Sequence, residues 1–116
     1  MVNRIIQTGQ MISLVASATG DTVVLATQTT SGFIVVNAFS MLANTTTTNQ
    51  ITAFQVSGST GSHFRSALDT SLDGINMVLG DGDKGWRLSK NTGLDVNLAT
   101  AGAISVDVLY SVVDDI

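Results

Sequence analysis

The sequence predicts an all-β protein, an antiparallel β-sandwich of about eight or nine strands. Apolar and polar residues alternate with a period of two along many short segments, and Gly, Asn, Asp and Ser separate these segments at short intervals. No segment shows the periodicity of a helix long enough to connect parallel strands. A jelly roll, with two sheets of about four strands each, fits this number of strands best.

A chain of 116 residues is expected to form one domain. We place this domain at residues 11–116 and interpret residues 1–10 as an N-terminal arm or an edge strand. Gln7, Thr8, Gly9 and Gln10 interrupt the early apolar residues before the core of a signal peptide forms. No run approaches the roughly 18 apolar residues of a membrane span, so no membrane partner is predicted.

The first half of the chain contains four expected strands, at residues 11–16, 22–27, 32–41 and 51–57. Residues 19–21 form a plausible hairpin loop between the first two strands. In the third strand, Phe33, Val35 and Asn37 are expected to face one way. Its other face is expected to carry Ile34, Val36 and Ala38.

The second half contains five expected strands, at residues 62–68, 75–79, 86–89, 94–99 and 104–112. The last of these has the clearest alternation, because apolar residues occupy every second position. These residues are Ile104, Val106, Val108, Tyr110 and Val112. The pattern predicts a core strand with one polar face.

Charged residues make up only 12% of the chain, and the formal net charge is -4. Five Lys and Arg residues are too few to neutralise a phosphate backbone, so nucleic acid is not an expected partner. The polar surface consists mainly of Thr, Ser, Asn and Gln, as in residues 45–48. Such a surface suits coverage by another protein, because neutral groups cost less to desolvate than ions. The equal alternative is the preference of Thr for β-strands.

No catalytic constellation is evident. His63 is the only histidine, and Ser62 and Asp69 lie near it in the sequence. A catalytic triad requires convergence in space beside an oxyanion hole, so His63 is interpreted as an ordinary strand residue. The chain has no cysteine to join His63 in a zinc site. We therefore predict a protein that is not an enzyme, with no catalytic residue, cofactor or metal site.

The loop at residues 81–85 resembles the start of a calcium-binding loop, because Asp81 and Asp83 are one residue apart. Gly85 stands where that pattern needs another oxygen ligand, and Thr92 stands where it needs a bidentate Glu. A tight β-turn is the favoured interpretation. A weak cation site completed by other loops is the alternative.

Several apolar residues are candidates for an interface. Trp86, the only tryptophan, is either a core residue or an interface anchor. Other apolar residues lie near the two ends of the chain, where one small sandwich has difficulty hiding them. The alternative for the C-terminal pair is a strand covered on both faces. The candidate interface residues are Ile5, Ile6, Trp86, Leu109 and Val113.

In composition and in the order of its segments, the sequence resembles the head decoration or cement proteins of tailed bacteriophages. The shared features are a short N-terminal arm, strands rich in Thr, Gly and Asn, a glycine turn, and a closing hairpin, here residues 93–98 and 103–110. Such proteins are commonly β-sandwich or jelly-roll modules. The resemblance implies a non-enzymatic virion structural protein on the capsid surface. It further implies a homotrimer or similar ring that clamps neighbouring copies of the major capsid protein.

A glycan-binding module of a phage tail or fibre is the alternative function. It would use Trp86, His63 and the loop at residues 81–85.

Overall fold

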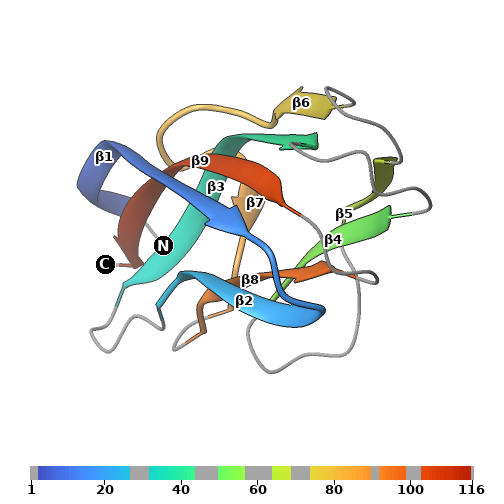
Figure 1. Ribbon diagram of the computed structural model, residues 1–116. Helices are drawn as coiled ribbons and strands as arrows, with labels where there is room; N and C mark the ends of the chain where they lie inside the picture. The colour runs from blue at the N-terminus through green and yellow to red at the C-terminus, as the bar shows by residue number, and fades with distance from the viewer. Residues whose placement is uncertain are drawn as a thin grey trace.

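The computed structural model describes residues 3–26, 32–43, 50–56, 64–68, 74–89, 92–98 and 103–115. In this part of the chain, nine strands form two antiparallel sheets that pack face to face (Figure 1). The strands are β1 (Asn3–Ala16), β2 (Gly20–Leu25), β3 (Phe33–Ala43), β4 (Gln50–Val56), β5 (Phe64–Leu68), β6 (Gly74–Val78), β7 (Trp86–Arg87), β8 (Leu94–Leu98) and β9 (Ile104–Asp115). The predicted antiparallel sandwich is confirmed.

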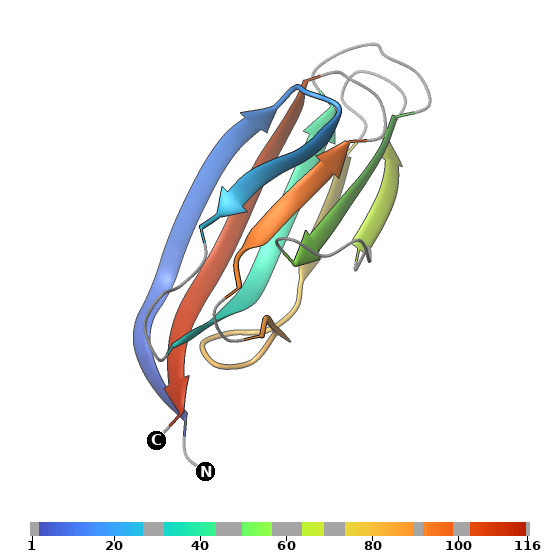
Figure 2. The same ribbon diagram turned by 90° about the horizontal axis from the view of Figure 1, so that it is seen from below.

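One sheet has five strands and the other has four. The five-stranded sheet has the order β1-β9-β3-β6, with β7 pairing with β3 beyond the end of β6. The four-stranded sheet has the order β2-β8-β4-β5 and lies in front in Figure 2. We expected two sheets of about four strands each. One sheet has a fifth strand, because the two residues of β7 also pair with β3, at Val35 and Val36.

The strands pair in a nested order, from the two ends of the chain toward its middle. β1 pairs with β9, β2 with β8, β3 with β6 and β7, and β4 with β5. The expected hairpin between residues 11–16 and 22–27 is wrong, because β1 and β2 lie in different sheets. The closing hairpin is wrong for the same reason, since β8 and β9 are also in different sheets. A short loop can return a strand to its own sheet or carry it across the sandwich, and the alternation of residues is the same in both cases.

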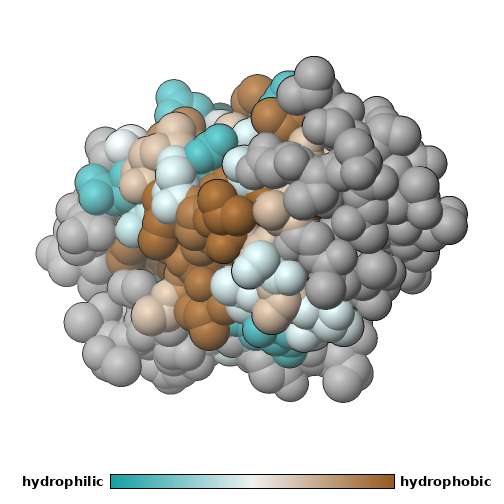
Figure 3. Space-filling model, in the orientation of Figure 1, coloured by the Kyte–Doolittle hydropathy of each residue, from teal (hydrophilic) through white to brown (hydrophobic). Residues whose placement is uncertain are grey.

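The hydrophobic core lies between the two sheets. β9 supplies every second residue to it, and Ile104, Val106 and Val108 are fully buried. Leu94, Val96 and Leu98 of β8 face them from the other sheet. Figure 3 shows hydrophobic residues gathered in the middle of the face seen in this view, between the two sheets of Figure 1.

β3 contains a β-bulge at Asn37. Its register against β9 shifts between Val36 and Ala38, which leaves Asn37 as the extra residue. Before the bulge, Ile34 and Val36 belong to the main core. After the bulge, the core residues are Phe39, Met41 and Ala43. The expectation that Ala38 shares a face with Ile34 and Val36 is therefore wrong, because the extra residue reverses the alternation.

The described N-terminal residues belong to β1, the edge strand of the five-stranded sheet. Its first part is irregular, with register shifts against β9 between Ile5 and Gln10 and a positive φ of 66° at Gly9. From Gln10 to Ala16, it pairs with β9 without interruption. Within the described ranges, no helix has the length and apolar character needed to cross a membrane.

Candidate interaction surface

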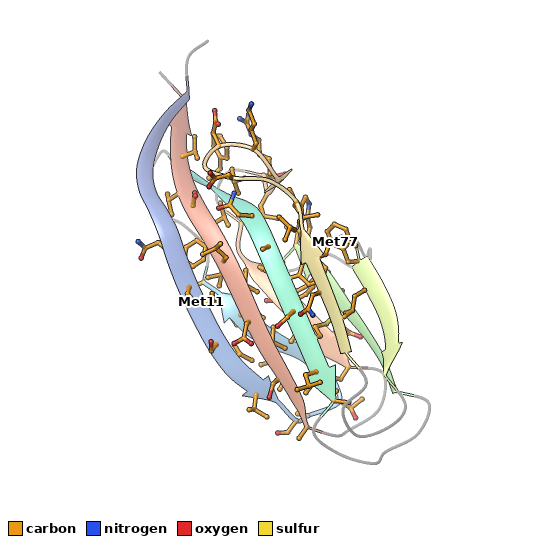
Figure 4. The ribbon with its side chains drawn as sticks, turned by 90° about the horizontal axis from the view of Figure 1, so that it is seen from above. Met11 and Met77 are labelled. Carbon is orange, nitrogen blue, oxygen red and sulfur yellow. The ribbon has the colours of Figure 1, made fainter. Side chains whose placement is uncertain are left out.

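The outer face of the five-stranded sheet, which points away from the core, is divided into two halves. One half lies under a capping loop, defined as residues 80–85, and includes β7, which follows the loop and pairs with β3. The other half, called here the open face, carries residues of β1, β9, β3 and β6 without this cover. Figure 4 views the molecule from this side, with β1 at one rim of the sheet.

Asn37 holds the capping loop on the sheet. Its side-chain Nδ2 donates to the backbone carbonyls of Gly82 and Lys84, at 3.1 and 3.0 Å. Its Oδ1 accepts a 2.8 Å hydrogen bond from Ser111 Oγ on β9. The backbone carbonyl of Asn37 accepts hydrogen bonds from the amides of Leu79 and Gly80. Asn37 and Ser111 are both buried, so this polar network replaces the water that their groups have lost.

The capping loop contains the tight turn that the sequence predicts at residues 81–85. The Lys84 amide donates to the Asp81 carbonyl at 3.0 Å. The carbonyls of Gly82 and Lys84 are engaged by Asn37. Among the described residues, no group of three or more His, Cys, Asp or Glu side chains is placed to hold a metal ion. The weak cation site therefore has no structural support in this part of the chain.

A small second core lies under the cap. Phe33, Val35 and Val113 form a buried cluster on the outer side of the sheet. The guanidinium of Arg87 covers it, with its central carbon 4.1 Å from the centre of the Phe33 ring. Val113, an interface candidate from the sequence, is thus completely buried inside the chain. It does not contribute to the outer surface of this molecule.

The open face carries three rows of side chains that run across four strands. The first row is apolar and consists of Met11, Leu109, Ala38 and Val78. The second row is polar and consists of Ser13, Asp107, Ser40 and Asn76. The third row is mixed and consists of Val15, Ser105, Leu42 and Gly74.

The open face exposes large apolar side chains and little charge. Val78 is 82% exposed, Met11 is 61% exposed, and Leu109 lies half-buried between their strands. Asp107 is the one charged residue in the three rows, and it accepts a 3.3 Å hydrogen bond from Ser40 Oγ. Water is therefore easily removed from this surface, because few ionic groups must lose their hydration.

Trp86, another interface candidate, packs against the main core. Its ring meets the Phe64 ring edge to face, with centroids 5.3 Å apart. Phe64 in turn contacts Phe39, and Phe39 contacts Phe54, so that aromatic rings join the two sheets. Sequence reasoning missed this cluster because its members lie far apart along the chain.

The outer face of the four-stranded sheet carries a polar network that sequence reasoning also missed. Asp21 on β2 accepts hydrogen bonds from Gln55 Nε2 at 2.8 Å and from Asn97 Nδ2 at 2.6 Å. These three residues link β2, β4 and β8 across the sheet. One feature of the sequence could have located this network. Asp95 and Asn97 alternate with the inward-facing apolar residues of β8, which places both on the outer side of the four-stranded sheet.

The remaining candidates from the sequence are only partly described. Ile5 and Ile6 lie in β1, where Ile5 pairs with Val113, but their side chains are outside the described residues. His63 lies outside the described residues altogether, so nothing tests its place near Ser62 and Asp69. No pocket was found in the part of the chain that the structure describes.

No protein-family model matches the sequence, and no curated protein matches it. What this protein does is therefore inferred from its own surfaces.

Proposed function

We propose that the protein is a non-enzymatic virion structural protein that decorates or cements a phage capsid and also self-associates. The open face carries this proposal. It presents a row of exposed apolar side chains beside neutral polar ones, with Asp107 as its charged residue. Exposed apolar patches of this kind mark interaction surfaces.

The expected partner is the major capsid protein on the outer surface of the shell. A capsid offers the same binding site many times, so a modest contact at each site adds up to a large stabilisation of the lattice. A chain with 12% charged residues suits this role, because its surface can be covered at low desolvation cost. The trimer or similar ring implied by the phage resemblance would add further contacts between neighbouring sites.

We also propose that the sandwich is a jelly roll. The nested pairing of β1 with β9, β2 with β8, β3 with β6 and β4 with β5 supports it. This is the order expected when one long antiparallel ribbon is wound into two sheets. Nuclear Overhauser contacts between strands that fit a different strand order would overturn this assignment.

The capsid proposal is tested by sedimenting the chain with shells assembled from the major capsid protein encoded in the same genome. We expect the wild-type chain to pellet with the shells in a saturable way. Val78→Asp places a charge in the apolar row of the open face, and we expect it to lower the affinity at least about tenfold because that charge must be desolvated on binding.

Val23→Asp is the matched control for this experiment. Val23 is also an exposed strand valine, at 60%, but it lies in β2 of the other sheet. Its substitution should leave shell binding unchanged. Failure of the wild-type chain to bind shells would contradict the proposal. Loss of binding in Val23→Asp alone would indicate that the four-stranded sheet, and not the open face, contacts the shell.

A further inference from the structure

The regular part of β1, residues 10–16, lies at one edge of the five-stranded sheet. β9 pairs with one side of it, and no described strand lies on the other side (Figure 4). An edge strand presents backbone amide and carbonyl groups that can pair with another strand. Natural proteins usually block such pairing with charges, prolines or bulges.

The two parts of β1 differ in this protection. Residues 3–9 include Arg4, Gly9 with its positive φ, and the register shifts against β9. Residues 10–16, with the sequence QMISLVA, contain no charge and no proline, and their register against β9 has no shift. This second part is a regular template for another strand.

We propose that a second copy of the chain pairs with this edge, β1 against β1, antiparallel across a two-fold axis at Ser13. The inference rests on the proposed self-association and names the surface that carries it. The two five-stranded sheets become one continuous sheet, and in each copy the exposed edge at residues 10–16 is covered.

In that register, the side chains of this segment match those of the same segment in the second copy. Met11 lies opposite Val15 of the partner subunit on the outer face, and both residues are exposed in the single chain, at 61% and 58%. Ile12 lies opposite Leu14 of the partner subunit on the inner face, where both residues are half-buried. Cross-strand apolar pairs of this kind stabilise a sheet, and no like charges face each other.

A two-fold axis at a neighbouring residue fits less well. An axis at Ile12 would place Met11 opposite a serine, and an axis at Leu14 would do the same to Val15. Only the axis at Ser13 brings the two exposed apolar residues of the segment together. The occupant that this edge fits best is therefore the same strand of a second copy, as in other isologous interfaces.

Ser13→Lys tests the pairing. In the single chain, the introduced ammonium group lies across from Asp107 on β9, so the fold is retained. In the pair, two ammonium groups would meet at the axis, and we expect the dissociation constant to rise at least about tenfold. Sedimentation velocity at several protein concentrations measures this change.

Asn76→Lys is the matched control for Ser13→Lys. Asn76 is exposed, lies in the same polar row, and belongs to β6 at the opposite rim of the sheet. We expect this variant to associate like the wild-type chain. Equal weakening by both substitutions, or a wild-type chain that stays monomeric at all concentrations, would overturn the proposal.

Ser13→Cys tests the register directly, because the natural chain has no cysteine. Directly opposite residues of an antiparallel pair have Cα atoms about 4.5–5.5 Å apart, within the range of a disulfide. Mild oxidation should therefore give a covalent dimer with Ser13→Cys and much less with Asn76→Cys. Equal cross-linking of the two variants would overturn the register.

The outcomes separate this proposal from the proposed function. A two-fold contact closes in pairs, whereas the trimer implied by the phage resemblance needs a heterologous contact. A trimer without cross-linking through Ser13→Cys would overturn the β1 pairing and leave the capsid role standing. Shell binding is measured independently, with Val78→Asp and Val23→Asp.

Discussion

At the scale of single residues, Asn37 has the largest structural consequence. It is the extra residue of the β3 bulge, and its amide connects β3, β9 and the capping loop. The bulge reverses which residues of β3 face the core, so it also decides which residues lie on the open face. One buried asparagine thus defines the boundary between the capped and open halves of the sheet.

Asn37→Ala should lower the free energy of unfolding by about 2–4 kcal/mol, because Ser111 Oγ and two backbone carbonyls lose their partner. Asn76→Ala, an exposed asparagine in the neighbouring strand β6, should change it by less than about 0.5 kcal/mol. Urea denaturation followed by circular dichroism measures both. Similar small effects of the two substitutions would show that the network contributes little.

At the scale of elements, the capping loop and the edge strand β1 shape the outer face of the five-stranded sheet. The capping loop lies over one half, where Phe33, Val35 and Val113 form a buried cluster, and leaves the other half open. Gly85 permits this close approach, because a Cβ atom there would lie 2.3 Å from the Val36 carbonyl oxygen and its φ is 150°. The loop therefore depends on glycine at this position.

Gly85→Ala should destabilise the protein by about 3 kcal/mol or more, because it combines a steric clash with a disfavoured φ. Gly20 is the control, since its φ is 97° but an added Cβ would meet no atom within 4 Å. Gly20→Ala should cost about 1 kcal/mol from its backbone conformation alone. Thermal unfolding compares the two variants, and equal costs would argue against the close contact with β3.

At the scale of the whole molecule, one core joins the two sheets. The rings of Phe54, Phe39, Phe64 and Trp86 pass from the four-stranded sheet to the five-stranded sheet. Because both sheets bury their apolar residues in the same cluster, neither retains a core when the other is lost. We expect the domain to unfold as a single unit.

Phe54→Ala should lower the free energy of unfolding by about 3–5 kcal/mol, because the ring is buried at the junction of the sheets. The fluorescence of Trp86 and the β-sheet circular dichroism signal should shift together. Leu42→Ala, at a 38% exposed position on the open face, should have a much smaller effect. Separate transitions for the two signals would contradict a single cooperative core.

Strand positions were largely predictable in the part of the chain that the structure describes, whereas strand partners were not. The alternation in residues 104–112 predicted the inward face of β9 correctly, because its register against the core is constant. The same reasoning failed at Ala38, because a bulge has no clear signature in one sequence. It also failed for the two expected hairpins, since a loop such as residues 17–19 connects strands within a sheet or between sheets equally well.

The surface was less predictable than the fold. Leu109, an interface candidate from the sequence, is half-buried on the open face, whereas Val113, four residues further along the same strand, is buried. The difference lies in their surroundings, because Val113 belongs to the buried cluster with Phe33 and Val35, whereas Leu109 lies in the apolar row of the open face. Val15 and Val78 were not singled out from the sequence, because their exposure depends on which strands lie at the rims of the sheet.

The sequence by itself determined the class of this protein: an antiparallel sandwich with low charge, no cysteine and a clear alternation of apolar residues. These properties follow from local composition and periodicity, which every segment carries independently. The tertiary structure decided the nested strand order, the cap held by Asn37, the open face and the exposed edge of β1. These features depend on contacts between residues far apart in the chain, and the free energy of such contacts is set only when the two sheets have come together.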